Sequence, residues 1–151
     1  MTQYYFAYGM NTNNDSMRHR SPASTSLGRA QLRNYQFRFA YHADVVPDIG
    51  NVVDGVLWTV DRAGLVALDV LEGYPRYYDR KKVTIECQGD LYRAWVYVMT
   101  PGNPLCMPSQ HYREMLFEGY RQHAVPVNQL IDGLERAGRY EIDHYDQMSY
   151  N

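Results

Sequence analysis

The sequence lacks the features that mark several large classes of protein. No segment approaches the roughly 20 consecutive apolar residues that a membrane-spanning helix needs, and the N-terminus has neither a basic stretch nor an extended apolar one. The 15 Lys and Arg are nearly balanced by 17 Asp and Glu, so the net charge of -2 provides no basic field to attract nucleic acid or an anionic membrane. We therefore expect a soluble, cytoplasmic protein with no nucleic-acid or membrane partner.

Motifs for cofactors, metals and activated nucleophiles are also absent. The sequence has no Gly-x-Gly-x-x-Gly, no P-loop and no Gly-x-Ser-x-Gly elbow. The five histidines never stand four residues apart and have no carboxylate-rich spacing, which argues against a metal site. The two cysteines, Cys87 and Cys106, form no Cys-x-x-Cys and are interpreted as reduced structural thiols. We expect no metal and no organic cofactor.

Tyrosine is present in excess, with 15 residues against four Phe and two Trp. Because tyrosine buries a ring while presenting a hydroxyl, such a chain can line a pocket that is apolar in its body and polar at its tips. Packing on a sheet explains any single tyrosine equally well. With 151 residues and 45% hydrophobic content, the chain is expected to form one domain over residues 1–151.

Hydrophobic periodicity predicts several strands. An aromatic segment ends at Gly9, and Gly55 inside a later strand suggests a bulge or the close approach of another backbone. Pro47 and Gly50 favour a loop over residues 44–51. A Gly-containing turn at residues 88–90 predicts a hairpin. The predicted strands are residues 4–8, 35–42, 52–60, 82–87 and 91–99.

The helix signals are strongest in the middle of the chain, where Asp61 is a plausible N-cap and Gly73 a plausible C-cap for a helix over residues 62–72. A short helix is predicted over residues 13–20, a second long one after Ser109, and a third after Pro126 that ends at residues 137–138. From about residue 139 the tail is polar and is expected to be extended or irregular. This order of elements predicts an α+β fold on a mostly antiparallel sheet.

Two features are candidates for chemistry. Ahead of the first helix, consecutive backbone N–H groups at Gly9 and its neighbours can collect a carboxylate or an oxyanion, although an ordinary turn has the same composition. Glu72 falls on the helix face that buries Leu65 and Leu68, where burial would raise its pKa into the range of a general acid and base. Alternatively, Glu72 is a solvated helix-end residue paired with Arg76 or Arg80, and Asp69 is a competing acid or a structural acceptor.

Three motifs in register resemble the gamma-glutamyl cyclotransferases. They are residues 5–11 (Tyr-Phe-Ala-Tyr-Gly-Met-Asn), residues 68–73 (Leu-Asp-Val-Leu-Glu-Gly) followed by Tyr78, and residues 97–100 (Tyr-Val-Met-Thr) ahead of a Pro-rich loop. The order and spacing are similar over nearly the whole chain. The resemblance implies a small, mostly antiparallel β-barrel with flanking helices.

The resemblance also implies the site and the reaction. Glu72 matches the family's catalytic glutamate, and the substrate-binding positions are Tyr8, Gly9, Met10, Asn11, Tyr78 and, by a looser match, Tyr97. The implied activity is cyclisation of a γ-glutamyl compound to 5-oxoproline, with release of an amino acid, a peptide, an amine or a capped metabolite. Met10 stands where the family usually has serine, which puts the substrate in doubt. A non-catalytic binding domain is the alternative, and the protein is expected to be a monomer or a homodimer.

Overall fold

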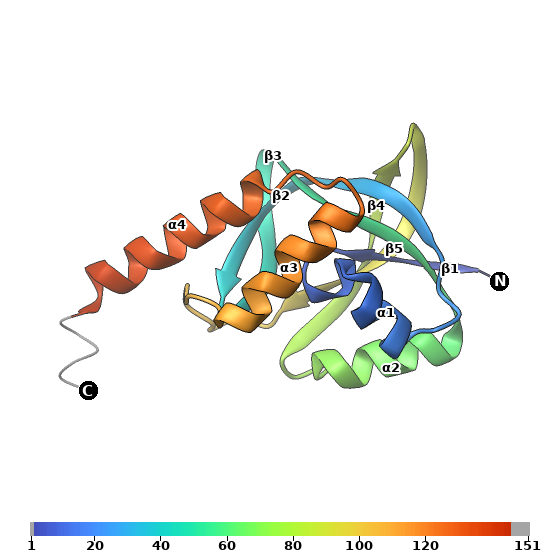
Figure 1. The fold of residues 1–151 in the computed structure, drawn as a ribbon, viewed down its shortest axis with the longest axis horizontal. Coiled ribbons are helices and arrows are strands. Elements are labelled where there is room, and N and C mark those ends of the chain that lie inside the picture. Colours follow the sequence, from blue (N-terminus) through green and yellow to red (C-terminus); the bar gives the residue numbers. More distant parts are fainter. Residues whose placement is uncertain (1, 146–151) are drawn as a thin grey trace.

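The structure is a computed structural model that describes residues 2–145, so the last six residues of the predicted polar tail lie outside the described part of the chain. Five strands and four α-helices follow one another with a short 3-10 turn, η1, after the first strand (Figure 1). The elements are β1 (Gln3–Ala7), η1 (Met10–Thr12), α1 (Asn14–Arg20), β2 (Ser26–Ala40), β3 (His42–Val60), α2 (Arg62–Glu72), β4 (Tyr78–Cys87), β5 (Asp90–Met99), α3 (Gln110–Gln122) and α4 (Asn128–Asp143).

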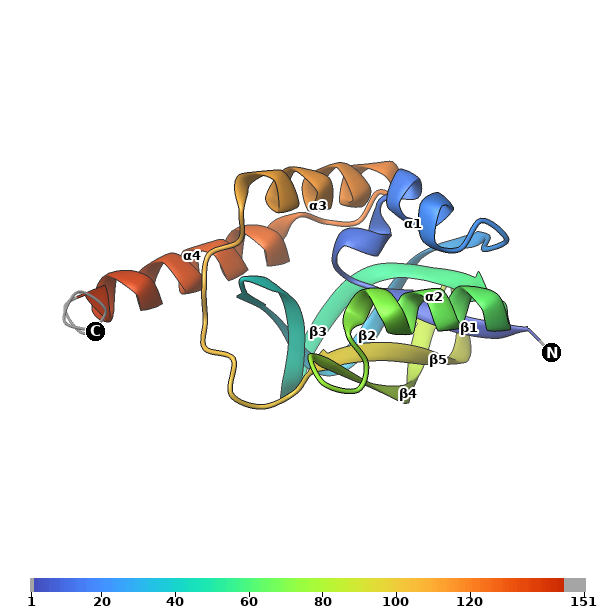
Figure 2. The same cartoon turned by 90° about the horizontal axis from the view of Figure 1, so that it is seen from below.

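The strands close into a barrel in the order β1-β3-β2-β4-β5. Every pairing is antiparallel except that of β1 with β5, where Tyr5 lies opposite Trp95 in a parallel arrangement. The helices lie outside the barrel, with α2 alongside β1 and β5 and with α1 and α3 together on another side (Figure 2). The predicted α+β class and the small, mostly antiparallel barrel with flanking helices are confirmed.

The predicted loop at residues 44–51 is wrong, because these residues continue β3. Pro47 lies opposite Tyr35 in the β2–β3 pairing, next to a register shift in β2. At that shift Asn34 has a positive φ of 66°, and its side-chain oxygen accepts a hydrogen bond from the backbone N–H of Gly50 at 3.1 Å. A proline is tolerated in a strand at such irregularities, since the ladder is already interrupted there. The β2–β3 hairpin therefore includes residues whose local sequence is typical of a loop.

Gly55 of β3 allows β1 to approach closely, as its place inside a strand suggested. A Cβ atom at this position would lie 2.3 Å from the backbone oxygen of Ala7 and 2.7 Å from a ring carbon of Phe6. No side chain fits at such distances, so glycine is required where the end of β1 meets the barrel wall. This contact fixes the position of the chain just before Gly9.

Helix α2 begins and ends where its caps predict. The Asp61 side chain accepts a hydrogen bond from the backbone N–H of Gly64 at 2.7 Å. At the other end Gly73 adopts the left-handed conformation (φ 65°), and the N–H of Tyr74 bonds the carbonyl of Asp69 at 3.0 Å. Such a glycine cap stops the helix sharply. Glu72 is consequently held as the last helical residue.

Helix α4 corrects the expectation that an irregular tail begins at Arg139. The helix continues to its end at Asp143, because its C-terminal half has polar anchors on the barrel side. Arg136 donates to the backbone carbonyl of Phe37 at 2.7 Å, and Glu141 accepts from the backbone N–H of Met107 at 2.9 Å. Gly138, predicted as the terminating residue, lies inside the helix. Within the described residues no helix has both the length and the apolar character that a membrane crossing requires.

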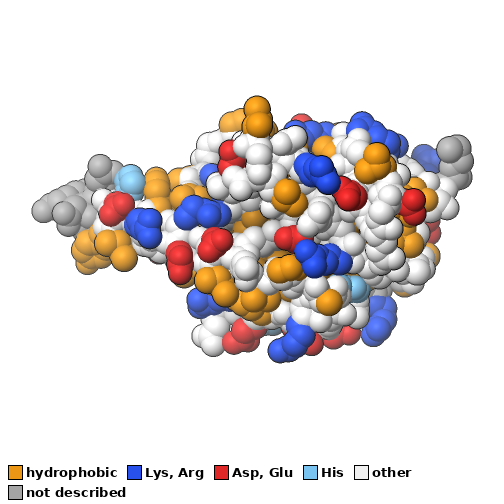
Figure 3. All heavy atoms as spheres, turned by 90° about the horizontal axis from the view of Figure 1, so that it is seen from above, with side chains coloured by type: hydrophobic (Ala, Val, Ile, Leu, Met, Phe, Trp, Pro, Cys, Tyr) orange, Lys and Arg blue, Asp and Glu red, His pale blue; other side chains and the backbone are white. Residues whose placement is uncertain are grey.

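Charged side chains of both signs are interspersed over the face seen in Figure 3, with no extended field of a single sign. The distribution agrees with the near balance of acidic and basic residues in the sequence. The core lies inside the barrel and beneath the helices, where its largest fully buried side chains include Phe6, Phe39, Leu68 and Tyr120.

Candidate active site

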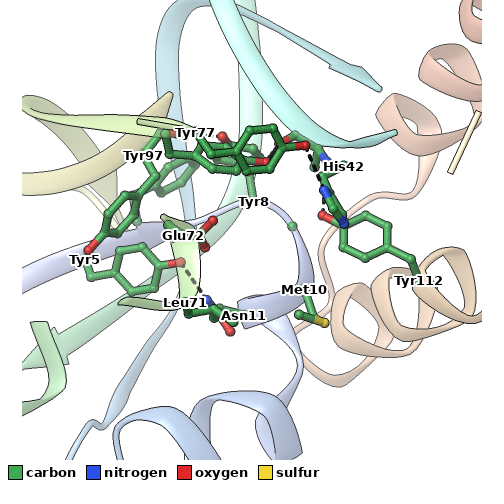
Figure 4. Close-up of a pocket in the computed structure, with 14 residues that line it drawn as sticks. Tyr5, Tyr8, Met10, Asn11, His42, Leu71, Glu72, Tyr77, Tyr97 and Tyr112 are labelled. Atoms are coloured by element: carbon green, nitrogen blue, oxygen red, sulfur yellow. Dashed lines mark hydrogen bonds between the residues drawn. The ribbon is translucent and has the colours of Figure 1, made fainter. Parts of the chain in front are cut away.

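A cavity of about 120 Å³ opens where the end of β1, turn η1, the end of α2, the start of β4 and helix α3 meet (Figure 4). It is smaller than the roughly 300–1,000 Å³ of pockets that hold drug-sized ligands. All seven residues predicted as site residues line it, although their roles remain predictions. The lining consists of Tyr5, Phe6, Tyr8, Gly9, Met10, Asn11, His42, Ala43, Leu71, Glu72, Tyr77, Tyr78, Tyr97 and Tyr112.

Glu72 is the only acidic side chain in this lining. It lies on the α2 face that buries Leu65 and Leu68, and burial raises its pKa from an ordinary 4.5 to about 7, against a smaller lowering by the positive charge of Arg20. Among residues 2–145 no hydrogen bond or ion pair is recorded for its carboxylate. Arg80, a partner considered from the sequence, binds Asp69 instead. The carboxylate is therefore available to a ligand and able to exchange a proton near neutral pH.

The turn after β1 presents backbone N–H groups to the same cavity. Its own hydrogen bonds run from the N–H of Thr12 to the carbonyl of Gly9 and from the N–H of Asn13 to the carbonyl of Met10, each at 3.1 Å. These bonds leave the N–H groups of the preceding turn residues outside the turn's own ladder, as at the start of any helix. Gly9 is close-packed, because a Cβ there would lie 3.2 Å from the Tyr112 hydroxyl. The turn combines amides that its own hydrogen bonds do not use with a tight backbone approach.

The side chain of Asn11 is buried and locked by two hydrogen bonds. Its amide nitrogen donates to the Tyr5 hydroxyl oxygen at 3.2 Å, and its oxygen accepts from the Ser16 hydroxyl at 2.9 Å. Within the described chain no acceptor is recorded for the hydroxyl proton of Tyr5. In Figure 4 the Tyr5 hydroxyl lies beside the Glu72 carboxylate, and the charge on Glu72 adds to burial in raising the pKa of Tyr5. Tyr5 thus offers a hydrogen-bond donor to the cavity.

Asp69 has a structural role in this structure, which was one of the two roles considered for it. One of its oxygens accepts a hydrogen bond from the Tyr97 hydroxyl at 2.7 Å, and the other pairs with Arg80 at 2.6 Å. The Tyr97 hydroxyl is consequently directed at Asp69, while its ring lines the cavity. Burial, followed by the bond to Asp69, raises the pKa of Tyr97, so the phenol stays protonated.

The other two tyrosines predicted to bind substrate also use their hydroxyl protons within the protein. Tyr78 donates to the carbonyl of Ala43 at 2.5 Å, and Tyr8 donates to the carbonyl of Tyr97 at 2.6 Å. A phenol oxygen that donates its proton still accepts a hydrogen bond from a ligand. These side chains therefore offer ring faces and acceptor oxygens, and no free donor.

Several lining residues were not among the predicted site residues. Tyr5 lies in β1, and His42 is the first residue of β3. Tyr77 immediately precedes β4, and Tyr112 lies in α3. Tyr77 and His42 are hydrogen-bonded at 2.8 Å between the Tyr77 hydroxyl and Nδ1 of His42. The abundance of tyrosine was the one available clue, since six of the chain's 15 tyrosines line the cavity. No cluster of three or more metal-ligating side chains occurs in residues 2–145.

Comparison with known proteins identifies relatives of one kind. The family model described as "Gamma-glutamyl cyclotransferase, AIG2-like" matches residues 5–115. A Bos taurus gamma-glutamylcyclotransferase is 26% identical over 137 residues, which cover 82% of this chain and 72% of that protein. A Drosophila melanogaster protein, itself named provisionally as a gamma-glutamylcyclotransferase, is 41% identical over 54 residues, and the match spans only 34% of that protein and 35% of this chain.

The fold has solved counterparts. A structure named gamma-glutamyl cyclotransferase superimposes with a TM-score of 0.77 at 22% identity, covering 91% of this chain and 87% of the other. At that identity the likeness concerns the fold of the two chains.

Proposed function

Because the chain belongs to the AIG2-like gamma-glutamyl cyclotransferase family, we propose that it cyclises a γ-glutamyl amide or peptide to 5-oxoproline and releases a free amine. One observation carries the proposal beyond family membership. A desolvated carboxylate, Glu72, with its pKa raised to about 7, lies in the same small cavity as Gly9, Met10 and Asn11 of the turn after β1. A general acid and base and an anion-binding turn are the two parts that this reaction needs.

In the proposed reaction the α-amine of the substrate attacks its own γ-carbonyl carbon. Glu72 first takes a proton from the α-ammonium group, which frees the nitrogen lone pair. A new carbon–nitrogen bond closes the five-membered ring, and Glu72 returns its proton to the departing nitrogen as the original amide bond breaks. The ring nitrogen, which carries two protons after the attack, gives one of them to the released amine, which departs as an ammonium ion. A carboxyl group whose pKa is close to the working pH performs both transfers, since neither protonation state is strongly favoured.

The oxygen of the attacked carbonyl becomes negatively charged during the reaction. We assign its stabilisation to the turn amides ahead of α1, together with the Tyr5 hydroxyl proton, which is free for this role. Removal of one such donor typically costs about 3–4 kcal/mol of transition-state stabilisation in enzymes that use an oxyanion hole. Tyr112 is a second candidate donor, because its oxygen accepts from the N–H of Ala43 at 3.0 Å and no acceptor for its hydroxyl proton is recorded within residues 2–145.

The small, largely buried cavity has a second use in this scheme. Intramolecular attack requires the flexible glutamyl chain to be folded so that its nitrogen and carbonyl carbon meet. Rings of Tyr8, Tyr78 and Tyr97, each no more than 5% exposed, form rigid walls for such a folded chain. Their hydroxyls are anchored on protein acceptors, which holds the rings in place. Positioning and electrostatics therefore suffice for the proposed chemistry.

The test measures 5-oxoproline release from a panel of γ-glutamyl compounds, with wild type compared with Glu72→Gln. Glu135→Gln is the matched control, because Glu135 is exposed on α4 and does not line the cavity. The proposal expects turnover of at least one compound by wild type and by the control, and a loss of about 10²–10⁴-fold in the Glu72 variant. Equal turnover by Glu72→Gln would contradict the role of Glu72 as the general acid and base. Absence of product from every compound would favour a non-catalytic binding domain.

A further inference from the structure

The cavity has a buried floor and a partly exposed rim. The floor residues are between 2% and 5% exposed, whereas the rim residues have intermediate exposure. Since the compact floor suits the glutamyl group in the proposed function, the leaving group has to extend over the rim. The floor consists of Tyr5, Tyr8, Asn11, Tyr78 and Tyr97, and the rim consists of Met10, His42, Leu71, Glu72, Tyr77 and Tyr112.

One side of the rim is an aromatic wall. The His42 ring packs edge-to-face against Tyr112 with centroids 5.1 Å apart and against Tyr77 with centroids 5.7 Å apart. Figure 4 shows His42, Tyr112 and Met10 on the side of the cavity opposite Tyr5. Burial lowers the pKa of His42, so the imidazole is neutral near pH 7. Ring edges, a thioether and a neutral imidazole form a surface that favours an aromatic group.

No cationic side chain lines the rim, and Arg20, whose charge lowers the pKa of Glu72, lies outside the cavity lining. Neither Lys nor Arg occurs among the cavity-lining residues, which all lie in the described chain. Arg80, close to the site in sequence, is paired with Asp69 at 2.6 Å. The only ionisable acid in the lining is Glu72, which repels a second anion when it is deprotonated. A leaving group that carries a carboxylate would therefore lose its hydration without gaining a partner.

We propose that the leaving group is an arylalkylamine without a carboxylate, so that the substrates are γ-glutamyl arylalkylamides. This inference rests on the proposed function and narrows it. The bonds made and broken are unchanged: the α-nitrogen bonds the γ-carbon, the amide bond to the aromatic amine breaks, and the proton held by Glu72 passes to the released amine. Met10 contributes the apolar contact at the position where a serine would offer a hydroxyl.

Three synthetic amides separate the contributions of ring and charge. γ-Glutamyl-phenethylamide carries the ring alone, γ-glutamyl-phenylalanine adds a carboxylate to the same skeleton, and γ-glutamyl-ethylamide removes the ring. With wild type, kcat/KM from 5-oxoproline release is expected to be at least about tenfold higher for the phenethylamide than for either of the others, the scale on which apolar pockets discriminate. Equal or faster turnover of γ-glutamyl-phenylalanine would overturn the inference and leave the cyclotransferase proposal intact. Absence of product from all three would overturn the inference, and it would overturn the cyclotransferase proposal as well only if every compound of the broader γ-glutamyl panel were also left intact.

A variant at the rim gives an independent readout. Met10→Arg places a cation where the leaving group passes, and Met10→Leu keeps the position apolar. In the arginine variant, the ratio of kcat/KM for the phenethylamide to kcat/KM for γ-glutamyl-phenylalanine is expected to fall by about tenfold. The leucine variant is expected to keep the wild-type ratio. Met10 is only partly buried, and thermal unfolding checks that both variants fold. An unchanged preference in folded Met10→Arg would contradict the inference, and the wild-type comparison decides the matter if that variant does not fold.

Discussion

Replacing Glu72 with glutamine should stabilise the folded protein at alkaline pH and change its stability little at acidic pH. In the folded protein, burial raises the pKa of this carboxyl from 4.5 to about 7. Between these two values the folded state binds more protons than the unfolded state, so the free energy of unfolding falls as the pH rises. Below pH 4.5 both states are protonated and the penalty vanishes. Above pH 7 both are ionised and the full desolvation cost is present.

The magnitude follows from the size of the shift. Each unit of pKa difference corresponds to about 1.4 kcal/mol, so a shift from 4.5 to about 7 destabilises the folded protein by about 3 kcal/mol at pH 8. Glutamine resembles the protonated acid in shape and carries no charge at any pH. The substitution should therefore be nearly neutral at pH 4 and stabilising by about 2–3 kcal/mol at pH 8, equivalent to an increase in Tm of roughly 4–12 °C.

Urea unfolding of wild type and Glu72→Gln at a series of pH values from 4 to 8 measures this difference. Because both proteins share every other titrating group, subtraction of the two pH profiles isolates the contribution of Glu72. The exposed control Glu135→Gln should show no such pH-dependent gain. A difference between wild type and Glu72→Gln that is constant over this range would show that the carboxyl is not desolvated in the folded state, and the assignment of a near-neutral pKa would be refuted.

Further predictions concern activity, backbone contacts and the ring anchors. With a substrate that is turned over, log kcat/KM should rise with a slope of one up to about pH 7 and then level off, because the general base has to be deprotonated; a flat profile from pH 5 to 8 contradicts this. Gly55→Ala should destabilise the fold by about 2–4 kcal/mol in urea unfolding, since its Cβ would meet the Ala7 carbonyl. Gly138→Ala is the paired test: its Cβ has only an ordinary contact and lies in a helix, so a gain of about 0.5–1 kcal/mol is expected. Tyr97→Phe removes the hydrogen bond to Asp69 and should cost about 1–2 kcal/mol of stability, measured in the same way.

The elements that local signals specify were predicted well. Helix α2 has its N-cap at Asp61 and its C-cap at Gly73, because each cap is made by a residue whose own side chain or backbone freedom supplies the interaction. The β4–β5 hairpin likewise follows from its Gly-containing turn. Prediction failed where a distant partner overrides the local pattern. Residues 44–51 look like a loop, yet residues 44–47 pair with residues 35–38 of β2 and the segment continues β3.

The candidate site likewise contains residues that local patterns predicted and residues that only long-range contacts bring to the cavity. The motifs around Gly9 and Glu72 were recognisable along the chain, because a strand–turn–helix and a helix with a carboxylate on its buried face are patterns of neighbouring residues. His42, Tyr77 and Tyr112 could not be assigned to the site, since they reach the cavity from three separate elements and no spacing connects them. The tyrosine-rich composition predicted a pocket of this character without saying which rings would form it.

The sequence by itself determined the class of fold, the caps of the central helix and the two motifs that chemistry would use, because these depend on interactions between near neighbours. Only the tertiary structure decided that the two motifs face one cavity, that Asp69 is occupied by Tyr97 and Arg80 while Glu72 is free, and that the rim is aromatic and without a cation. These properties arise from closure of the barrel, which brings together residues far apart in the chain and removes water from around them. Desolvation, which sets the pKa of Glu72, exists only after that closure.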